Sequence, residues 1–390
     1  MKTRILRYLK HLGLTILVLL LILIPVGISE GAQVSYGHDS ASLNFDGEGP
    51  YVFYKNDSLV TVKYIRGNKD DGFAIDEKDF SVNQPIPAEV YFPLDQTKFN
   101  FTIPTSFETP RSIYRDNKKI LAISDIESGF KTFRDFLIQN KVIDKNLHWI
   151  FGENHLVLLG DFVDRGFSTT QVLWLIFKLE QEAKKQGGTV HFILGNHELK
   201  NMYGDHQAAS LKYTFVASML GKTQSELYSK NAVLGRWLSS KNVIESINGT
   251  LFVHGGLHPE ITALNMSIPQ INAFMRKTYY EAPYPKVDED KKELLISSKT
   301  GICWYRGYFK EDLSQEEVEK PLKKLKANAV VVGHTLHFSV KKFFEGKVYG
   351  IDVKHSSDYH KNWPDYDSEG LLITDGNYYR AMADGTLEKL

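Results

Sequence analysis

The chain has 390 residues, 42% of them hydrophobic, which is enough for a large buried core and excludes a disordered, collagen-like or coiled-coil protein. Its 47 Lys and Arg residues balance 47 Asp and Glu residues, so we expect no nucleic acid among its partners. The single cysteine, Cys303, excludes an internal disulfide and a cysteine-rich zinc site, whereas 13 histidines leave another kind of metal site open.

A basic flank followed by an apolar run at the N-terminus indicates membrane insertion. The four basic residues of the first ten precede the apolar stretch 12–28, which just reaches the length needed to cross the hydrocarbon of a bilayer. We therefore favour an uncleaved signal anchor over residues 1–29, with a cleaved signal peptide as the alternative. Because positive flanks stay in the cytoplasm, the rest of the chain is expected in the periplasm, or secreted if the segment is cleaved.

The next two segments differ in composition. Residues 30–50 are polar and rich in Ser, Gly and Asp, which predicts a linker. Residues 51–115 contain short runs of alternating apolar and polar residues, broken by clusters of Gly, Asn, Asp and Pro. This pattern predicts a small β module packed on the main domain.

Residues 116–390 alternate short apolar strands with amphipathic helices, which predicts one α/β domain. Helical periodicity over 130–144 and 169–186 indicates two helices that face the core. A third helical region, at about 205–242, is richer in Lys, Ser and Tyr. We expect it to form a cap near the ends of the strands.

Polar residues able to bind metal follow five apolar runs of the α/β domain. Because the carboxyl ends of strands gather at one edge of such a sheet, we expect these side chains to converge. A single strand-terminal Asp more often caps a helix, and a single His is more often an ordinary core or surface residue, but the repetition favours a metal site. The candidate ligands are Asp125, Glu127, Asp161, Asn196, His254 and His334.

Several blocks of sequence resemble the calcineurin-like metallophosphoesterases. They are Gly160-Asp161-Phe162-Val163-Asp164-Arg165-Gly166, Gly195-Asn196-His197-Glu198, His254-Gly255-Gly256 and Gly333-His334. The block Trp304-Tyr305-Arg306-Gly307 looks most like the phosphoprotein phosphatase branch, and the run Leu234 to Leu257 is similar to the bacterial Shewanella-like phosphatases. The resemblance covers about residues 119–352. It implies a two-sheet α/β/β/α sandwich with a dinuclear metal site.

The resemblance also implies a role for each candidate residue. Asp161 would lie between two divalent ions, with Asp125 on the first, and with Asn196, His254 and His334 on the second. His197 would protonate the leaving alkoxide, oriented by Asp164, and Glu198 is expected to accept hydrogen bonds rather than bind metal. Arg165 and Arg306 would bind the outer phosphate oxygens, although Arg306 is also interpretable as a structural cation on an aromatic ring.

The first block departs from the family pattern. The family has Asp-x-His-Gly, whereas this chain has Asp125-Ile126-Glu127-Ser128. Glu127 either binds the first metal, which favours Mn, Fe or Mg over Zn, or turns away from it. In the second case His337 is a candidate substitute, although a surface strand residue is the simpler interpretation of His337.

These inferences predict a metal-dependent phosphomonoester hydrolase. The branch resemblance favours phosphorylated protein as the substrate. An enzymatic alternative is hydrolysis of nucleotides or other small phosphoesters, which would need a base pocket such as one built from Tyr203, Tyr213 and Phe215. A third hypothesis is a catalytically inactive, membrane-tethered binding protein, and Glu127 is its only support.

Overall fold

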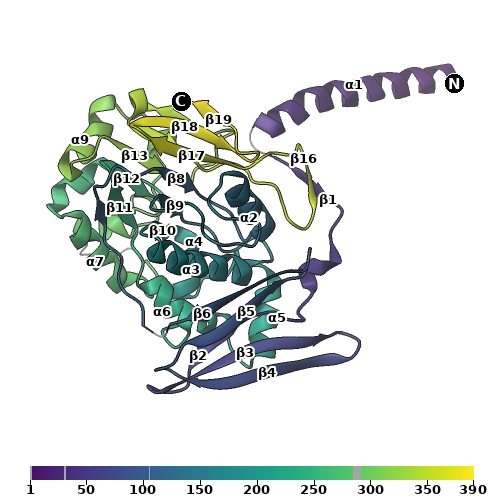
Figure 1. The fold of residues 1–390 in the computed structure, drawn as a ribbon. Helices are drawn as coiled ribbons and strands as arrows, with labels where there is room; N and C mark the ends of the chain where they lie inside the picture. Colours follow the sequence, from purple (N-terminus) through teal and green to yellow (C-terminus); the bar gives the residue numbers. More distant parts are fainter. Residues whose placement is uncertain (1, 30–31, 105, 284–290) are drawn as a thin grey trace.

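The computed structural model describes residues 2–29, 32–104, 106–283 and 291–390 (Figure 1). Its first element is the helix α1 (Lys2–Ser29), whose 28 residues project from the body of the molecule and bury none of their side chains. At 1.5 Å per residue the helix is about 42 Å long, which exceeds the ~30 Å of a bilayer's hydrocarbon. The segment is therefore long and apolar enough to cross a membrane, as a signal sequence near an N-terminus also is.

Two six-stranded sheets form the centre of the molecule. The first sheet has the order β10 (Thr189–Ile193), β9 (His155–Leu159), β8 (Ile120–Ile123), β17 (Glu369–Thr374), β18 (Asn377–Met382) and β19 (Leu387–Lys389). The second has the order β14 (Lys341–Phe343), β15 (Val348–Gly350), β13 (Ala329–Val332), β12 (Thr250–Val253), β11 (Ile244–Ile247) and β7 (Ile113–Tyr114). The strands β8, β9 and β10 are parallel, as are β12, β13 and β15. Their carboxyl ends therefore share one edge in each sheet.

The two sheets pack face to face through alternate side chains of their strands. Val157 and Ile193 of the first sheet join Phe252 and Val331 of the second in one buried cluster. The intervening residues, such as Leu158 and Val332, point outward into the larger core that includes the helices. This arrangement confirms the predicted α/β/β/α sandwich. The outer helices are α2 (Phe130–Gln139) and α3 (Thr169–Lys185) on the first sheet's side, and α7 (Ile268–Thr278) and α9 (Gln315–Leu325) on the second's.

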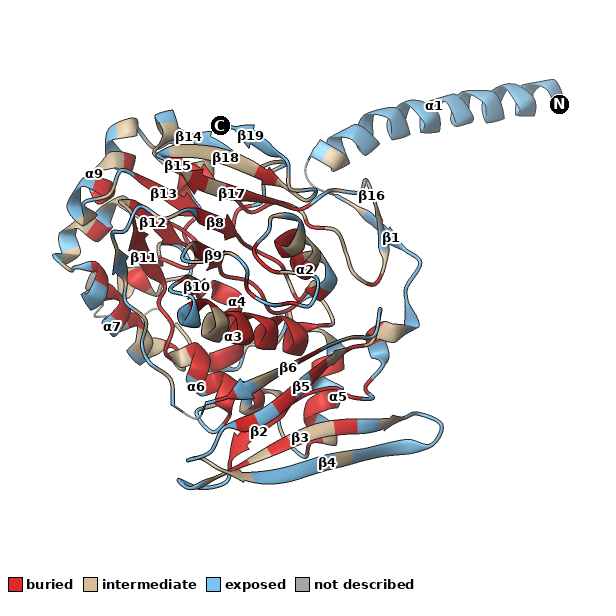
Figure 2. Cartoon of the chain, viewed as in Figure 1, coloured by how far each residue is buried: buried red, intermediate tan, exposed pale blue. Residues whose placement is uncertain are grey.

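Both predicted core helices of the first sheet are present. The helix α2 ends at Gln139 rather than near residue 144, because Lys141 adopts a left-handed φ of 58° that a helix cannot continue through. The helix α3 ends at Lys185, one residue before its expected end. Both bury the apolar faces that their periodicity indicated (Figure 2).

The region 51–115 forms a three-stranded antiparallel sheet and a hairpin. The sheet contains β2 (Tyr51–Tyr54), β3 (Leu59–Asn68) and β4 (Gly72–Ser81), and the hairpin contains β5 (Ile86–Phe92) and β6 (Thr97–Ile103). These strands share the main core, since the ring of Phe101 lies 5.1 Å from that of Trp174 in α3. Ile113 and Tyr114, which form β7, lie outside this module because β7 pairs with β11 of the second sheet.

The structure differs from the linker expected over residues 30–50. Its first half contributes β1 (Val34–Tyr36), which pairs with β16 (Lys361–Trp363), and its second half buries Phe45 and Glu48. The Glu48 carboxylate accepts a hydrogen bond of 2.8 Å from the ammonium of Lys212, which is fully buried. The polar composition indicated a linker. It gave no sign of this packing because the residues that contact the segment lie far away in the sequence.

The region expected to form a cap lies partly beside the strand ends, since the backbone carbonyl of Ala208 accepts a hydrogen bond of 2.9 Å from the amide of Arg165. Region 205–242 contains α5 (Leu211–Met219) and α6 (Val233–Ser239), and α6 packs on β2 of the small β module (Figure 1). Its residues Val233, Trp237 and Leu238 are buried. The ring of Trp237 also packs against Phe177 of α3 and Phe192 of β10, with centroids 5.5 Å apart in both pairs. The helix α6 therefore joins the small β module to the first sheet.

Candidate active site

The predicted metal ligands follow the carboxyl ends of strands from both sheets. Asp125, Asp161 and Asn196 come after β8, β9 and β10, whereas His254 and His334 come after β12 and β13. Asp125, Asp161 and His334 have left-handed φ angles of 54°, 58° and 63°. Such angles cost a non-glycine residue roughly 1–3 kcal/mol and are typical of functional sites. The strained backbone at these residues thus turns their side chains toward one another.

Gly160 allows the strand ends to approach closely. It has a φ of 79°, and a Cβ at this position would lie 2.5 Å from the backbone of Gly195 and 2.7 Å from Nδ1 of His254. Any larger residue would separate the two ends of the neighbouring strands. The glycine that precedes Asp161 in the sequence motif is therefore required by the packing of the site.

Asp161, His254 and His334 form a buried cluster whose ligand atoms lie within 4.8 Å of one another. The Nδ1 of His254 donates to the carbonyl of Leu159 at 2.7 Å, which leaves Nε2 to face the cluster. That Nε2 lies 3.2 Å from Oδ2 of Asp161 and 3.1 Å from Oδ1 of Asn196. Two imidazoles, a carboxylate and an amide oxygen so placed fit a divalent cation.

Carboxylates crowd the other side of the cluster. Burial and the charge of Asp161 raise the pKa of Asp125 to about 6, although His254 opposes the shift. Burial and the charge of Asp125 also hold the pKa of Asp352 well above its usual range. Buried acids that destabilise one another in this way fit a site that a cation neutralises. The residues present therefore suit the two-metal centre that the family resemblance implies.

Asp352 was missed by the sequence analysis, although the signal was available. It follows β15 as the other acids follow their strands, and it is buried beside Arg306 and Asp125. Asp352 follows an apolar run, as the candidate ligands follow the five apolar runs of the sequence analysis. It was passed over because no family block contains it.

His197 and Asp164 form the pair expected of a general acid and its orienting carboxylate. The Nδ1 of His197 lies 2.7 Å from Oδ2 of Asp164, and the amide of Asn201 donates to the other carboxylate oxygen at 2.7 Å. Burial disfavours the imidazolium, but the hydrogen bond that the ring donates to Asp164 and the charge of Asp161 outweigh it and raise the pKa of His197. The ring can therefore hold a proton and present Nε2 to the cavity.

Glu198 supports the site without entering it, as predicted. Its buried carboxylate accepts hydrogen bonds from the backbone amides of Asp161, Phe162 and Gly195 at 2.8–2.9 Å. It thereby ties the start of α4 (Asn196–Tyr203) to the end of β9. This contact fixes Asn196 relative to Asp161.

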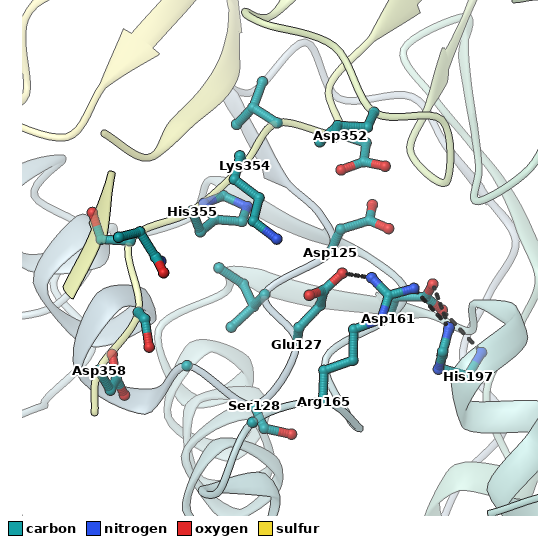
Figure 3. A pocket seen from close by; sticks show the side chains of 18 of the residues that line it. Asp125, Glu127, Ser128, Asp161, Arg165, His197, Asp352, Lys354, His355 and Asp358 are labelled. Atoms are coloured by element: carbon teal, nitrogen blue, oxygen red, sulfur yellow. Dashed lines mark hydrogen bonds and ion pairs between the residues drawn. The ribbon is translucent and has the colours of Figure 1, made fainter. Parts of the chain in front are cut away.

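The two arginines and Glu127 line the same cavity. Arg165 forms an ion pair with Glu127, and one of its nitrogens lies 3.4 Å from Nε2 of His197 (Figure 3). Arg306 donates to the backbone carbonyl of His334. Glu127 thus turns its carboxylate toward the guanidinium of Arg165, and its ligation of a metal stays a prediction.

His337 lies away from the cluster. Its ring packs against Phe309 and Phe343, with centroids 4.4 and 5.1 Å apart, and its backbone forms an isolated parallel β-bridge with Val353. The described lining of the cavity includes Leu336 but not His337. The interpretation of His337 as a surface strand residue agrees only in part, because this packing leaves the ring half-buried between aromatic side chains.

A cavity of about 410 Å³ opens over the cluster. One wall carries the predicted residues Asp125, Glu127, Asp161, Arg165, His197, Arg306 and His334. The opposite wall is the polar segment 352–362, which the sequence analysis did not assign and which contributes Lys354 and His355 (Figure 3). The family blocks do not cover most of this segment, and its polar composition alone does not indicate a cavity wall.

Comparisons with known proteins agree with this geometry. The family model of the calcineurin-like phosphoesterases matches residues 118–338. Shewanella-like protein phosphatase 1 of Plasmodium berghei is 29% identical over 275 residues, which cover 64% of this chain and 71% of that protein. Shewanella-like protein phosphatase 2 of Arabidopsis thaliana is 29% identical over 123 residues, or 32% of this chain and 30% of that protein.

A solved structure extends the similarity beyond the matched segment. The cold-active protein-tyrosine phosphatase of a psychrophilic Shewanella species superimposes with a TM-score of 0.76 and 28% identity, covering 88% of this chain and 99% of that one. The hypothesis of an inactive binding protein has no support in a chain that keeps the ligand cluster and the acid pair. The chain therefore belongs to the calcineurin-like phosphoesterase family, and within it to the metal-dependent phosphatases related to the Shewanella-like protein phosphatases.

Proposed function

We propose that this chain removes phosphate from phosphorylated proteins outside the cytoplasm. The observation that carries the proposal is the convergence of strand-end ligands from both sheets on the cavity that also contains the His197–Asp164 pair. Asp161 would be shared by two divalent ions, with Asp125 on the first, and with Asn196, His254 and His334 on the second. Such ions lower the pKa of a bound water and neutralise phosphate oxygens.

The side chains of this chain account for binding and proton transfer. Arg306, fixed by the carbonyl of His334, and Arg165, beside His197, can each bind an outer phosphate oxygen. His197 carries a proton at Nε2 because Asp164 accepts the one at Nδ1. The leaving oxygen of the substrate then receives the proton of Nε2.

The shape of the cavity supports a protein substrate over a nucleotide. Tyr213 is buried, and its hydroxyl donates a hydrogen bond to the carbonyl of Phe167. Phe215 is 54% exposed, and its ring packs against that of Phe45. Among the described residues that line the cavity, neither of these nor Tyr203 occurs. The base pocket that a nucleotide would need is therefore not built from these three, whereas an open polar wall suits a phosphorylated side chain.

The metals proposed are Mn, Fe or Mg rather than Zn. The first ion would lie among the carboxylates of Asp125, Asp161 and Asp352, which line the cavity together with Glu127. Oxygen ligands of this kind suit harder cations, whereas zinc prefers nitrogen and sulfur.

The test uses the full-length chain, stripped of metal by a chelator and then resupplied with one ion at a time. Phosphatase activity is measured on phosphotyrosine and phosphoserine peptides and on nucleoside monophosphates. We expect no turnover without metal, recovery with Mn greater than with Zn, and faster turnover of a peptide than of any nucleotide. Full activity after chelation, or a preference for nucleotides, would refute the proposal.

A further inference from the structure

The ribbon formed by β1 and β16 has two different faces. In its antiparallel register Val34 lies opposite Trp363 and Tyr36 lies opposite Lys361, whereas Ser35 lies between them opposite Asn362. Side chains of opposed residues share a face, and successive residues alternate. One face of the ribbon therefore carries Val34, Tyr36, Lys361 and Trp363, and the other carries Ser35 and Asn362.

The first of these faces is apolar and exposed. Val34, Tyr36 and Trp363 are 62%, 54% and 53% exposed, although a soluble surface rarely gathers such residues together. Trp and Tyr with a neighbouring Lys are the residues that proteins place at the boundary between lipid and water. The composition of this face thus fits the headgroup region of a bilayer.

The length of chain between α1 and β1 keeps this face close to the membrane. Only four residues separate Ser29, the last residue of α1, from Val34, the first of β1. Five peptide units span at most about 18 Å even when fully extended. If α1 crosses the bilayer, the ribbon therefore begins within ~18 Å of the point where the helix leaves it.

The second face of the ribbon, which carries Ser35 and Asn362, adjoins the active-site cavity. Asn362, whose side chain accepts a 2.8 Å hydrogen bond from Ser35, lines the cavity together with Tyr359. The carbonyl of Tyr359 in turn accepts a 2.8 Å hydrogen bond from the amide of Asp39. The segment that follows the membrane helix is thus bonded to the wall of the active site.

We propose that the face of Val34, Tyr36, Lys361 and Trp363 rests in the headgroup region of the bilayer that holds α1. The other face of the same ribbon then sets the mouth of the active-site cavity beside the bilayer surface. This inference rests on the retention of α1 in the membrane and goes beyond the proposed phosphatase activity.

Trp363 provides a direct probe of this contact. The full-length chain is reconstituted in phosphatidylcholine vesicles, with or without lipid brominated near the top of the acyl chain, because bromine quenches nearby tryptophan. Since Trp363 is one of five tryptophans, we expect the brominated lipid to remove up to about one fifth of the fluorescence. The Trp363→Phe variant should lose this bromine-dependent decrease. The Trp304→Phe variant, which removes a partly buried tryptophan of the site, should keep it.

A second pair of variants tests the face without changing the probe. Val34→Asp should reduce the quenching of Trp363, whereas Leu211→Asp, at a 74% exposed position on α5, should not. Equal quenching in the parent and in Trp363→Phe would overturn the inference. Loss of the first 29 residues, seen by intact mass with release from the vesicles, would overturn it too. Phosphatase activity retained in that released chain would show that the proposed function survives.

Discussion

His197 lies between two carboxylates that serve different purposes. Its ring is held by Asp164, while its backbone amide donates to Oδ1 of Asp161 at 2.9 Å. The His197→Ala variant keeps this backbone contact and loses only the proton donor. We expect turnover to fall by about 10² to 10⁴, since general acid catalysis contributes that factor.

The measurement is turnover on a phosphopeptide together with metal content by elemental analysis. His148→Ala is the matched control, because His148 is exposed and pairs with Glu182. Unchanged turnover in His197→Ala would remove this residue from the mechanism. Loss of metal along with activity would show that its role is structural.

The ion pair between Glu127 and Arg165 predicts that Glu127 competes with substrate phosphate for this guanidinium. Since the guanidinium pairs with Glu127 in the structure, Glu127→Gln should free it for phosphate. A partly exposed ion pair contributes about 0–1 kcal/mol, so the inhibition constant of inorganic phosphate should fall by a factor of up to about 5 in the variant.

The inhibition constant of phosphate and the metal content distinguish the two interpretations of Glu127. An unchanged metal content with tighter inhibition supports its role as a partner of Arg165. The loss of one metal equivalent would instead show that Glu127 is a ligand. Glu153→Gln, which breaks the exposed pair with Lys118, should change neither quantity.

Individual residues were predictable where a local rule governs them. Asp161 and His254 follow apolar strands, and the topology of the sheet brings them together. The ion pair of Glu127 and the position of Lys354 depend on neighbours that are distant in sequence and have no periodic signature. Sequence reasoning therefore identified the metal-binding half of the cavity and missed the wall opposite.

At the level of elements, a buried ion pair joins the segment before β2 to α5. The carboxylate of Glu48 accepts hydrogen bonds from Lys212, Gln171 and Tyr51 at 2.8–3.1 Å. Glu48→Gln leaves the buried ammonium of Lys212 without its counter-charge. We expect the free energy of unfolding to fall by about 3–5 kcal/mol, as for other buried pairs broken on one side.

The same pair makes a pH-dependent contribution to stability. Burial opposes ionisation, but the charge and hydrogen bond of Lys212 outweigh it and lower the pKa of Glu48. A carboxyl with a depressed folded pKa stabilises the fold above its unfolded pKa of about 4.3, and the contribution is lost as pH falls below that value.

Melting temperatures of the parent and Glu48→Gln, measured from pH 7 to 3, check both statements. The difference between the two proteins should be largest at pH 7 and shrink toward pH 3. Glu108→Gln, which removes an exposed partner of Lys184, should leave the melting temperature unchanged at every pH. A difference that is constant over this range would contradict the assignment of the effect to Glu48.

Element types were predictable from periodicity, whereas their placement was not. The apolar faces of α2 and α3 emerged from their repeats. For the region 205–242 the sequence indicated helices, but α6 packs on β2, which lies about 180 residues earlier, and on α3 and β10. The apolar periodicity of a helix predicts that one of its faces is buried. Which element covers that face depends on the topology of the whole chain.

At the scale of the whole molecule, the basic N-terminal flank predicts the side of the membrane on which the active site lies. If Lys2, Arg4 and Arg7 stay in the cytoplasm, the C-terminus lies outside it. A reporter that is active only outside the cytoplasm should therefore work when it is fused after Leu390. Activity of a reporter that requires the cytoplasm would contradict this orientation.

The division of the candidate metal ligands between the two sheets has a consequence for local opening of the fold. Asp125 of the first sheet and the amide of His334 in the second, 209 residues apart in sequence, are joined by a hydrogen bond of 3.1 Å beside the cluster. A cation held by ligands from both sheets is released when either sheet opens, so its binding free energy couples the two. Metal at 100 times its dissociation constant should slow amide hydrogen exchange about 100-fold at the carboxyl ends of β9 and β12 alike. Slower exchange in one sheet alone would show that the ion is held from that side only.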